Sequence, residues 1–232
     1  PYNACTLGFA VAPRLNASGR MSDASLGVEL FLCRDPNRAD EIIARLNKLN
    51  ELRQQDEANI LNDAIRRLEP CDLSDTRAIV LRSETWNAGV IGIAASRIAE
   101  MYHRPTILFS ESDGILKGSA RSIDGVNIHE VLCCCRELFV RFGGHAKAAG
   151  ITMESAFFED FRLKLNACLK AGYDDSVFIP CKRYEFDIPL EQVTGELIAE
   201  LTRLAPFGES NPSPVFRSRH VAVSRLRRFG SD

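Results

Sequence analysis

Residue types that suit the binding of a phosphate group gather at the end of a predicted strand, in the segment Lys117-Gly-Ser-Ala-Arg-Ser122. Side chains alternate between the two faces of a strand, so Ser119 and Arg121 share one face and Lys117 leads onto it. A hydroxyl donor beside a guanidinium fork matches the geometry of a phosphate. An exposed strand edge with solvated charges would show the same pattern, so this segment alone leaves both interpretations open.

A glycine-rich segment, Gly143-Gly-His-Ala-Lys-Ala-Ala-Gly150, is interpreted as a loop that could hold an anion. Gly143 and Gly144 let the backbone approach a ligand closely, and their successive N–H groups could form an anion-binding nest. His145 can donate a hydrogen bond to a phosphate oxygen, and Lys147 adds positive charge. The glycines could equally serve tight turns.

A third candidate contact for an anion is Arg20, in the predicted loop Ser18-Gly-Arg20 that precedes a helix. Its guanidinium could reach an anion, or it could pair with the nearby Asp23. The spacing of the residues does not decide between these two roles.

The pattern lacks the residues that a complete hydrolytic site requires. Metal-assisted hydrolysis of a phosphodiester needs carboxylates and imidazoles that converge on two ions about 3.5–4 Å apart. No histidine has an Asp or Glu at ligand spacing; the four are His103, His129, His145 and His220. Glu130, beside His129, is interpreted as a polar residue of a first helical turn. Since a P-loop and a GxSxG segment are also missing, we expect no metal site and no catalytic centre in this chain.

The composition is that of a globular protein without a strong overall charge. The 232 residues are 45% hydrophobic and 26% charged, which allows one large or two modest domains. A net charge of -2 means that any contact with phosphates depends on local placement of arginine and lysine. From Val215 onward there are five arginines and one acidic residue, so a basic end is available for nucleic acid. With no apolar run of membrane-spanning length and a start at Pro1, we expect an excised piece of a soluble cytoplasmic protein.

The eight cysteines indicate reduced thiols and not a disulfide framework or a zinc site. There is no CxxC pair, and Cys133, Cys134 and Cys135 are consecutive, which suits neither arrangement. On a helix these three side chains would point in different directions, with Cys135 inward.

The elements that must position these residues begin with a predicted strand over Leu7–Ala12, a loop to Arg20 and a helix over Ala24–Cys33. Asp35-Pro36 then reads as an N-cap followed by a first-turn proline. From there to Glu69 apolar residues keep a period near 3.6, which predicts one helix of roughly 50 Å that would suit a connector between domains.

Strands and helices then alternate, which predicts a mixed sheet covered by helices. The predicted strands are Ala78–Leu81, Thr106–Phe109, Ile115–Ala120 and Ile151–Met153, and the predicted helices are Gly89–Tyr102, Ile128–Arg141 and Phe157–Ala171. After Gly172 the pattern changes to short strands over Tyr184–Ile188 and Val215–Leu226 with a helix over Thr194–Leu204 between them, as at the start of a β-rich domain.

Five segments of this chain occur in the order and approximate spacing of RecJ-type single-strand-specific exonucleases, which belong to the DHH phosphoesterase superfamily. The segments are Ala12–Ser25, Gly89–Arg97, Lys117–Ser122, Phe142–Gly150 and Pro206–Pro214. The chain therefore resembles the carboxyl-terminal portion of that family over nearly its whole length. One departure is Asn87, where such sequences usually have a histidine.

The resemblance implies an α/β protein with four parts. Residues 1–34 would be the tail of the DHH catalytic domain, and residues 35–70 the connector helix. Residues 71–173 would form a mixed-sheet DHH-associated domain that binds substrate, and residues 174–232 the beginning of an OB-fold, a partial OB-like β-domain.

The resemblance also implies roles for individual residues. Arg20, Ser119 and Arg121 would bind the 5′-terminal phosphate or the neighbouring backbone, and the two segments Ser119/Arg121 and Gly143–His145 would converge into a single pocket. The remaining residues implied to line the cleft or to make secondary contacts with DNA are Gly143, Gly144, His145, Lys117, Lys147, Arg217 and Arg219.

The implied function is that of a fragment of a metal-dependent 5′→3′ exonuclease acting on single-stranded DNA in repair and recombination. The parent enzyme would use Mn²⁺ or Mg²⁺, whereas this fragment would bind no metal and cut nothing. Two alternatives stay open: a superfamily phosphodiesterase for oligoribonucleotides or cyclic dinucleotides, and a non-catalytic module that binds single-stranded nucleic acid.

Overall fold

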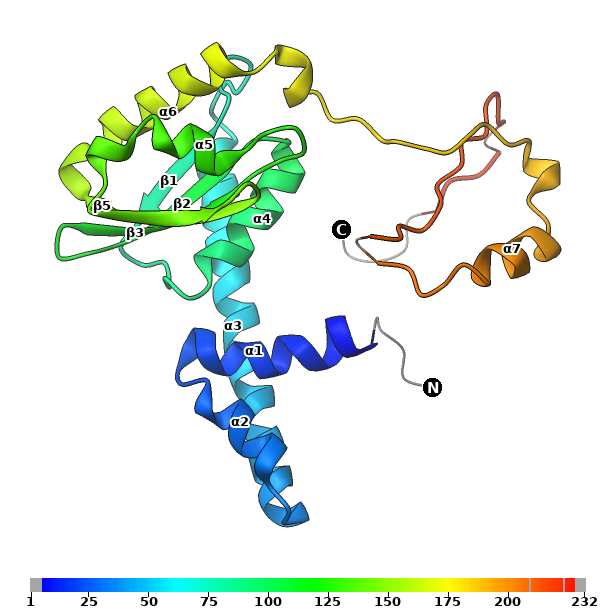
Figure 1. Cartoon of the computed structure of the whole chain (residues 1–232), viewed down its shortest axis with the longest axis horizontal. Coiled ribbons are helices and arrows are strands. Elements are labelled where there is room, and N and C mark those ends of the chain that lie inside the picture. Colours follow the sequence, from blue (N-terminus) through cyan, green and yellow to red (C-terminus); the bar gives the residue numbers. More distant parts are fainter. Residues whose placement is uncertain (1–5, 209, 223, 228–232) are drawn as a thin grey trace. The chain divides into compact units, whose positions relative to one another are not determined.

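The computed structural model describes residues 6–208, 210–222 and 224–227 (Figure 1). The chain divides into two compact units, Pro1–Pro180 and Cys181–Asp232. Within the described residues, no helix is both long enough and apolar enough to cross a membrane.

From residue 6, where the described part of the first unit starts, the chain is helical. A π-helical turn, Thr6–Val11, leads directly into α1, Ala12–Met21, and α2 follows over Ser25–Leu32. The strand and the loop predicted for residues 7–20 were therefore wrong. A short apolar run carries no period that separates strand from helix, and Pro13 is tolerated in the first turn of α1, where its missing N–H is not needed.

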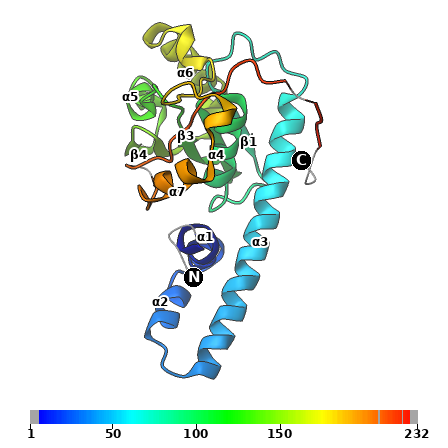
Figure 2. The same cartoon turned by 90° about the vertical axis from the view of Figure 1, so that its right-hand side faces the viewer.

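The long helix is confirmed as α3, Pro36–Leu68, which has 33 residues. Asp35 caps it, since its carboxylate accepts a hydrogen bond of 3.0 Å from the Asn37 N–H. At its start, Ile42 and Leu46 pack with Leu26 of α2, and near its end Ile60 and Ala64 enter the core of the sheet region. Figure 2 shows α3 as one rod that passes α1 and α2 and reaches the sheet.

Five strands form one mixed sheet in the order β1-β2-β3-β5-β4. The strands are β1 Ile79–Ser83, β2 Thr106–Ser112, β3 Ile115–Arg121, β4 Arg141–His145 and β5 Ala148–Glu154. β1 and β2 are parallel and are joined through helix α4, as parallel neighbours require, whereas all other pairs are antiparallel.

Helices cover both faces of the sheet, which confirms the expected α/β class (Figure 1). Helix α4, Ile91–Tyr102, packs with the end of α3 on one face around Trp86 and Leu108. Helices α5, Ile128–Cys133, and α6, Phe158–Gly172, pack on the other face. Short 3₁₀ turns of the first unit lie at Arg136–Leu138, Ser155–Phe157 and Asp175–Phe178, and one of the second unit lies at Leu190–Gln192.

Helix α4 is also fixed to α3 by charge. Glu57 is almost fully buried on α3, and Arg97 of α4 places its Nε 2.6 Å from one Glu57 carboxylate oxygen. Arg53, one turn before Glu57 on α3, binds the other oxygen. The Arg53–Glu57 pair is buried within α3, and the more exposed Arg97 adds one ion pair between α3 and α4.

The structure corrects two predictions around the glycine-rich segment. The helix predicted over residues 128–141 ends at Cys133, because the chain turns at the buried Cys135. The predicted loop from Gly143 to Gly150 is instead a hairpin of β4 and β5, in which Gly143 pairs with Gly150. Glycines carry no side chains to show the alternation of a strand, so the sequence pattern suggested a loop.

The second unit carries helix α7, Gly195–Thr202, inside the range predicted for it, and the Thr194 hydroxyl caps its first turn. Of the predicted strands over 184–188 and 215–226, the second includes residue 223, which lies outside the described residues. Among the described residues, the two segments pair at an isolated bridge between Asp187 and Arg217. The Glu185 N–H donates to the Val215 carbonyl at 2.8 Å, and the Ile188 N–H donates to the Arg217 carbonyl at 2.9 Å. Prolines 189, 212 and 214 flank the paired residues and supply no N–H donors that would lengthen the ladder.

Candidate phosphate-binding face

Ser119 and Arg121 lie together on β3 and face helix α4. The Arg121 Nη1 donates a hydrogen bond of 2.8 Å to the Ser119 Oγ. Both side chains lie over Gly92 in the first turn of α4, where an added Cβ would stand 2.7 Å from Arg121 Nη2 and 2.8 Å from Ser119 Oγ. The period of two in the strand therefore correctly placed these two side chains on one face, and Gly92 provides the space for them.

Arg20 joins this cluster from the end of α1. Its Nη1 donates to the Gly89 carbonyl at 3.2 Å, in the turn that leads into α4. Its guanidinium is near enough to Arg121 that, after burial, the charge of Arg20 is the second cause of the lowered pKa of Arg121. Asp23 instead accepts hydrogen bonds from the Ser25 N–H at 2.9 Å and the Ser25 Oγ at 2.8 Å.

Neither arginine of this cluster has a carboxylate partner in the part of the chain that the structure describes. Arg20 is exposed and Arg121 half-buried, so two neighbouring positive charges are held without a counter-charge. Like charges close together raise each other's energy. A bound anion would remove that cost, which makes the cluster a candidate anion site.

The glycines of the hairpin extend the same face. Across β3, β5 and β4, Ser119 is in register with Gly150 and Gly143, and Arg121 is in register with Ala148 and His145. Residues directly opposite one another on paired strands project to the same face of a sheet. Gly143, Gly150 and His145 therefore lie on the face that carries Ser119 and Arg121. Ser119, Gly150 and Gly143 form one row across the strands, and Arg121, Ala148 and His145 form the next.

This row of small residues leaves the face open. A Cβ added at Gly143 or Gly150 would meet nothing within 4 Å, and both glycines are exposed. At Gly144 an added Cβ would stand only 2.4 Å from the Ala148 carbonyl oxygen, so that glycine is required by the hairpin itself. The predicted anion-binding nest was wrong, because Gly143 and Gly144 are paired strand residues.

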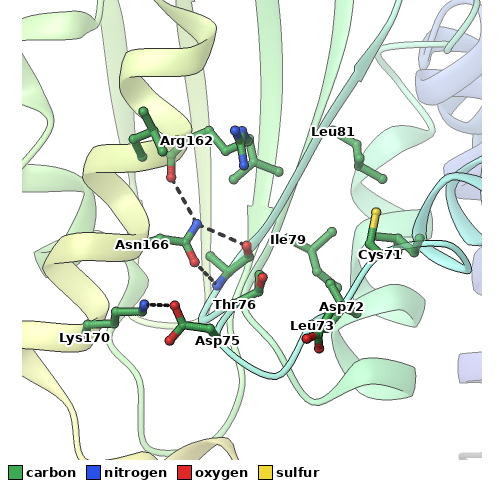
Figure 3. A pocket seen from close by; sticks show the side chains of 14 residues that line it. Cys71, Asp72, Leu73, Asp75, Thr76, Ile79, Leu81, Arg162, Asn166 and Lys170 are labelled. Atoms are coloured by element: carbon green, nitrogen blue, oxygen red, sulfur yellow. Dashed lines mark hydrogen bonds and ion pairs between the residues drawn. The ribbon is translucent and has the colours of Figure 1, made fainter.

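The two predicted segments thus share one face of the sheet, on which Gly143 and His145 are exposed. A cavity of about 570 Å³ lies elsewhere, between α6, the free edge of β1 and the loop before it (Figure 3). There the Asn166 Oδ1 accepts from the Arg77 and Ala78 N–H groups at 2.8 and 2.9 Å, and Lys170 pairs with Asp75. These contacts fasten α6 to the start of β1, which is a structural role.

The cations predicted to make secondary contacts differ in availability. Lys117 is exposed on the face that carries Ser119. Lys147 binds the Asp124 carboxylate at 2.5 Å. In the second unit, Arg217 and Arg219 both bind Asp187, at 2.6 and 2.8 Å.

Sequence reasoning missed two glycines that shape this site. Gly89 and Gly92 both start the α4 segment, and each lies against a residue of the arginine cluster. A Cβ at Gly89 would stand 2.1 Å from the Arg20 carbonyl oxygen. The signal was the pair of glycines three residues apart at the start of the predicted helix Gly89–Tyr102, since a glycine there allows close approach of another backbone or side chain.

The described residues offer no set of ligands for a divalent ion. Among them, no group of three or more histidine, cysteine, aspartate or glutamate side chains is placed to hold a metal ion. Burial raises the pKa of the Cys135 thiol to about 12, so this thiol stays protonated.

Comparisons with known proteins agree with this arrangement. Residues 75–171 match the DHHA1 domain family, and residues 184–232 match the RecJ OB domain family. The single-stranded-DNA-specific exonuclease RecJ of Bacillus subtilis is 38% identical over 229 residues, which is 98% of this chain and 29% of that protein. The RecJ of Escherichia coli is 35% identical over 235 residues, 98% of this chain and 41% of that protein.

A solved structure shows the same fold. The crystal structure of RecJ in complex with Mn²⁺ from Thermus thermophilus superimposes with a TM-score of 0.81 at 33% identity, and the match covers 92% of this chain and 31% of that one. A second structure from the same organism, with Mg²⁺, gives a TM-score of 0.79 at 34% identity, covering 92% of this chain and 33% of that one. The chain thus spans between 29% and 41% of the length of the two curated relatives named above. The matches confirm the predicted resemblance and the order of a mixed-sheet domain followed by an OB domain.

Proposed function

Because this chain belongs to the RecJ family, we propose that it forms the part of a metal-dependent 5′→3′ single-stranded-DNA exonuclease that holds the 5′ end and the following strand. The observation that carries the proposal is the cluster of Arg20, Ser119 and Arg121, two guanidinium groups and a hydroxyl with no carboxylate partner among the described residues.

The chemistry of this cluster fits a terminal phosphate better than an internal one. A phosphate monoester carries nearly two negative charges at neutral pH, whereas an internal diester carries one. Two adjacent guanidinium groups gain most from the doubly charged group, and the Ser119 hydroxyl adds a donor on the same side. The cluster would therefore select a 5′-phosphorylated end over an internal position of the strand.

The hairpin beside the cluster would receive the first nucleotides. Gly143 and Gly150 leave the face free of side chains, so a sugar or base can approach the sheet closely. His145, in register with Arg121, would add a hydrogen-bond donor at the end of this row, and Lys117 a charge on the same face.

The second unit would guide the rest of the strand by stacking. Tyr184 and Phe186 are exposed, Phe186 lies 4.9 Å from the Phe216 ring, and Arg217 lies 4.1 Å above the Tyr184 ring. Aromatic side chains on OB domains stack with bases of any sequence. Arg217 and Arg219 would add phosphate contacts only where Asp187 releases them.

The metal chemistry would be supplied by residues outside this chain. Related RecJ structures contain Mg²⁺ or Mn²⁺, and the described residues here offer no ligand set for either ion. We propose that the parent enzyme uses one of these ions to cleave DNA in repair and recombination in the cytoplasm, and that this chain by itself binds DNA without cutting it.

Fluorescence anisotropy with two single-stranded oligonucleotides of one sequence tests the proposal. One carries a 5′-phosphate and the other a 5′-hydroxyl, and we expect the phosphorylated strand to bind more tightly by about tenfold or more. Equal affinities would contradict the 5′-phosphate site. In a second test, Mn²⁺ and a labelled strand are added to the chain, and steady release of mononucleotides would show that the catalytic residues are present after all.

The alternative of a phosphodiesterase for oligoribonucleotides or cyclic dinucleotides is less well supported. Such small substrates need no strand guide, whereas residues 184–232 match a RecJ OB domain. A cyclic dinucleotide or dinucleotide that competes with the phosphorylated strand at equal concentration would favour this alternative.

A further inference from the structure

Asn87 links three elements at the edge of the arginine cluster. It lies in the turn between β1 and α4, where its Oδ1 accepts a hydrogen bond of 2.9 Å from the Gly89 N–H. Its Nδ2 donates to the Asp56 carboxylate of α3 at 3.1 Å and lies 3.8 Å from the Met21 sulfur at the end of α1. One amide side chain therefore connects the turn to both flanking helices.

Gly89, which Asn87 holds, is also the residue that holds Arg20. The Gly89 carbonyl accepts the hydrogen bond from the Arg20 guanidinium at 3.2 Å. The Gly89 Cα lies so near the Arg20 backbone that an added Cβ would stand 2.1 Å from the Arg20 carbonyl oxygen. A shift of Gly89 would therefore move both the backbone and the side chain of Arg20.

Arg20 needs such a tether because electrostatics opposes its position. Its side chain is exposed, its neighbour Arg121 has the same charge, and no ion pair in the described part of the chain holds it there. An exposed arginine without a tether would occupy many rotamers and turn away from a like charge. The Gly89 carbonyl supplies a fixed acceptor on the side that faces the cluster.

We propose that Asn87 and Asp56 are positioning residues, which hold Gly89 and through it keep Arg20 beside Arg121, and that they thereby set the selectivity for a 5′-terminal phosphate monoester. This inference rests on the proposed function of the cluster. Neither residue contacts the phosphate, and both act through the place of Arg20.

The surroundings of Asn87 make this role separable from folding. Asn87 and Asp56 are half-buried and line a cavity of about 240 Å³. The hydrophobic contacts that seat α4 come from other residues, among them the buried Val90 and Ile91. Loss of the amide should therefore loosen the turn without unfolding the sheet.

The first test replaces Asn87 with alanine in the full chain. We expect Asn87→Ala to weaken binding of the 5′-phosphorylated oligonucleotide about five- to tenfold, because Arg20 is then no longer held in place for its contact with the phosphate. The affinity for the 5′-hydroxyl oligonucleotide should stay within about twofold, because that strand does not make this contact. An unchanged ratio of the two affinities would overturn the proposal, whether neither affinity changes or both fall by the same factor. Asn59→Ala is the matched control, because Asn59 lines the same cavity but is bonded to Gln55.

A swap of the two polar groups provides the rescue. N87D places two carboxylates side by side and should lose the selectivity, whereas D56N keeps an acceptor for the amide and should retain it. The double variant N87D/D56N restores one donor and one acceptor, so the selectivity should return. A double variant no better than N87D would count against the pair as the positioning device.

Arg121→Ala in the same assay separates this inference from the function on which it rests. If Arg121→Ala leaves the ratio of affinities unchanged, the phosphate site itself is refuted. If Arg121→Ala abolishes the preference and Asn87→Ala does not, only the positioning role fails. The pKa of the bound 5′-phosphate, followed through its ³¹P resonance, gives a readout that does not depend on protein stability. Two neighbouring guanidinium groups should lower this pKa, and in Asn87→Ala it should return toward the value of the free oligonucleotide.

Discussion

Two pairs of arginines, one in each unit of the chain, differ in what surrounds them. Arg20 and Arg121 lie close together with no carboxylate partner among the described residues. Arg217 and Arg219 share one carboxylate, Asp187, and the pKa of Arg217 is raised chiefly by its hydrogen bond to that group. The basic character of the carboxyl-terminal segment therefore overstates the charge it can offer to DNA.

The difference has an energetic basis. An anion that binds Arg20 and Arg121 relieves a repulsion that already exists in the free protein. A phosphate that binds Arg217 or Arg219 must first separate it from Asp187, and the gain is the small difference between two ion pairs near the surface. Unpartnered charge is thus a better guide to an anion site than the local count of basic residues.

The largest effect is expected from Arg121→Ala. Hydrogen bonds to charged groups contribute about 1.5–3 kcal/mol, so the preference for a 5′-phosphorylated strand should fall about tenfold or more. The two oligonucleotides in the anisotropy assay measure this directly. Arg121→Lys keeps the charge but loses the fork, and it should recover only part of the preference.

Gly92→Ala should have an intermediate effect through sterics alone. The new methyl would press on Arg121 Nη2 and Ser119 Oγ, which are the ends of side chains and can shift. We expect about a threefold loss of the 5′-phosphate preference. The loss is partial because the ends of the Arg121 and Ser119 side chains can shift and keep part of their contact with the phosphate. Gly172→Ala, where an added Cβ meets nothing within 4 Å, controls for the added methyl. No loss in Gly92→Ala would show that the pair does not need its present position.

A smaller change of opposite sign is expected from Asp187→Ala. It frees two arginines in the second unit, so affinity for single-stranded DNA should rise a few-fold at low salt, equally for both 5′ ends. The slope of log affinity against log salt should also steepen, by about 0.7 for each further phosphate that the freed arginines neutralise. A salt titration measures the slope, and an unchanged slope would mean that these arginines do not reach DNA.

The smallest effect belongs to Arg217→Ala in the otherwise unchanged chain. Because this arginine is already engaged by Asp187, we expect a loss of about twofold or less and no change in the 5′-phosphate preference. A loss comparable to that of Arg121→Ala would erase the contrast between the two pairs. The free energy of unfolding, followed by circular dichroism, would show whether such a loss came from unfolding of the second unit.

The sequence predicted local structure correctly wherever the structure depends on residues close together in the chain. The cap at Asp35 and the apolar period that follows determined the long helix, since both act within a few residues. The period of two in β3 likewise placed Ser119 and Arg121 on one face. The prediction of a strand and a loop for residues 7–20 was wrong, because the apolar residues and the proline of this segment fit a helix equally well.

Only the tertiary structure distinguished residues of the same type whose surroundings the sequence does not show. Gly143 and Gly144 are neighbours of one type, yet the first faces open space and the second would collide with Ala148. Arg20 stood between two roles until the fold placed it at Gly89, a residue 69 positions away. The sequence by itself determined which side chains could bind a phosphate, because that follows from their chemistry. Only folding decided which of them lack a counter-charge, because a charge is neutralised by neighbours in space and not by neighbours in the chain.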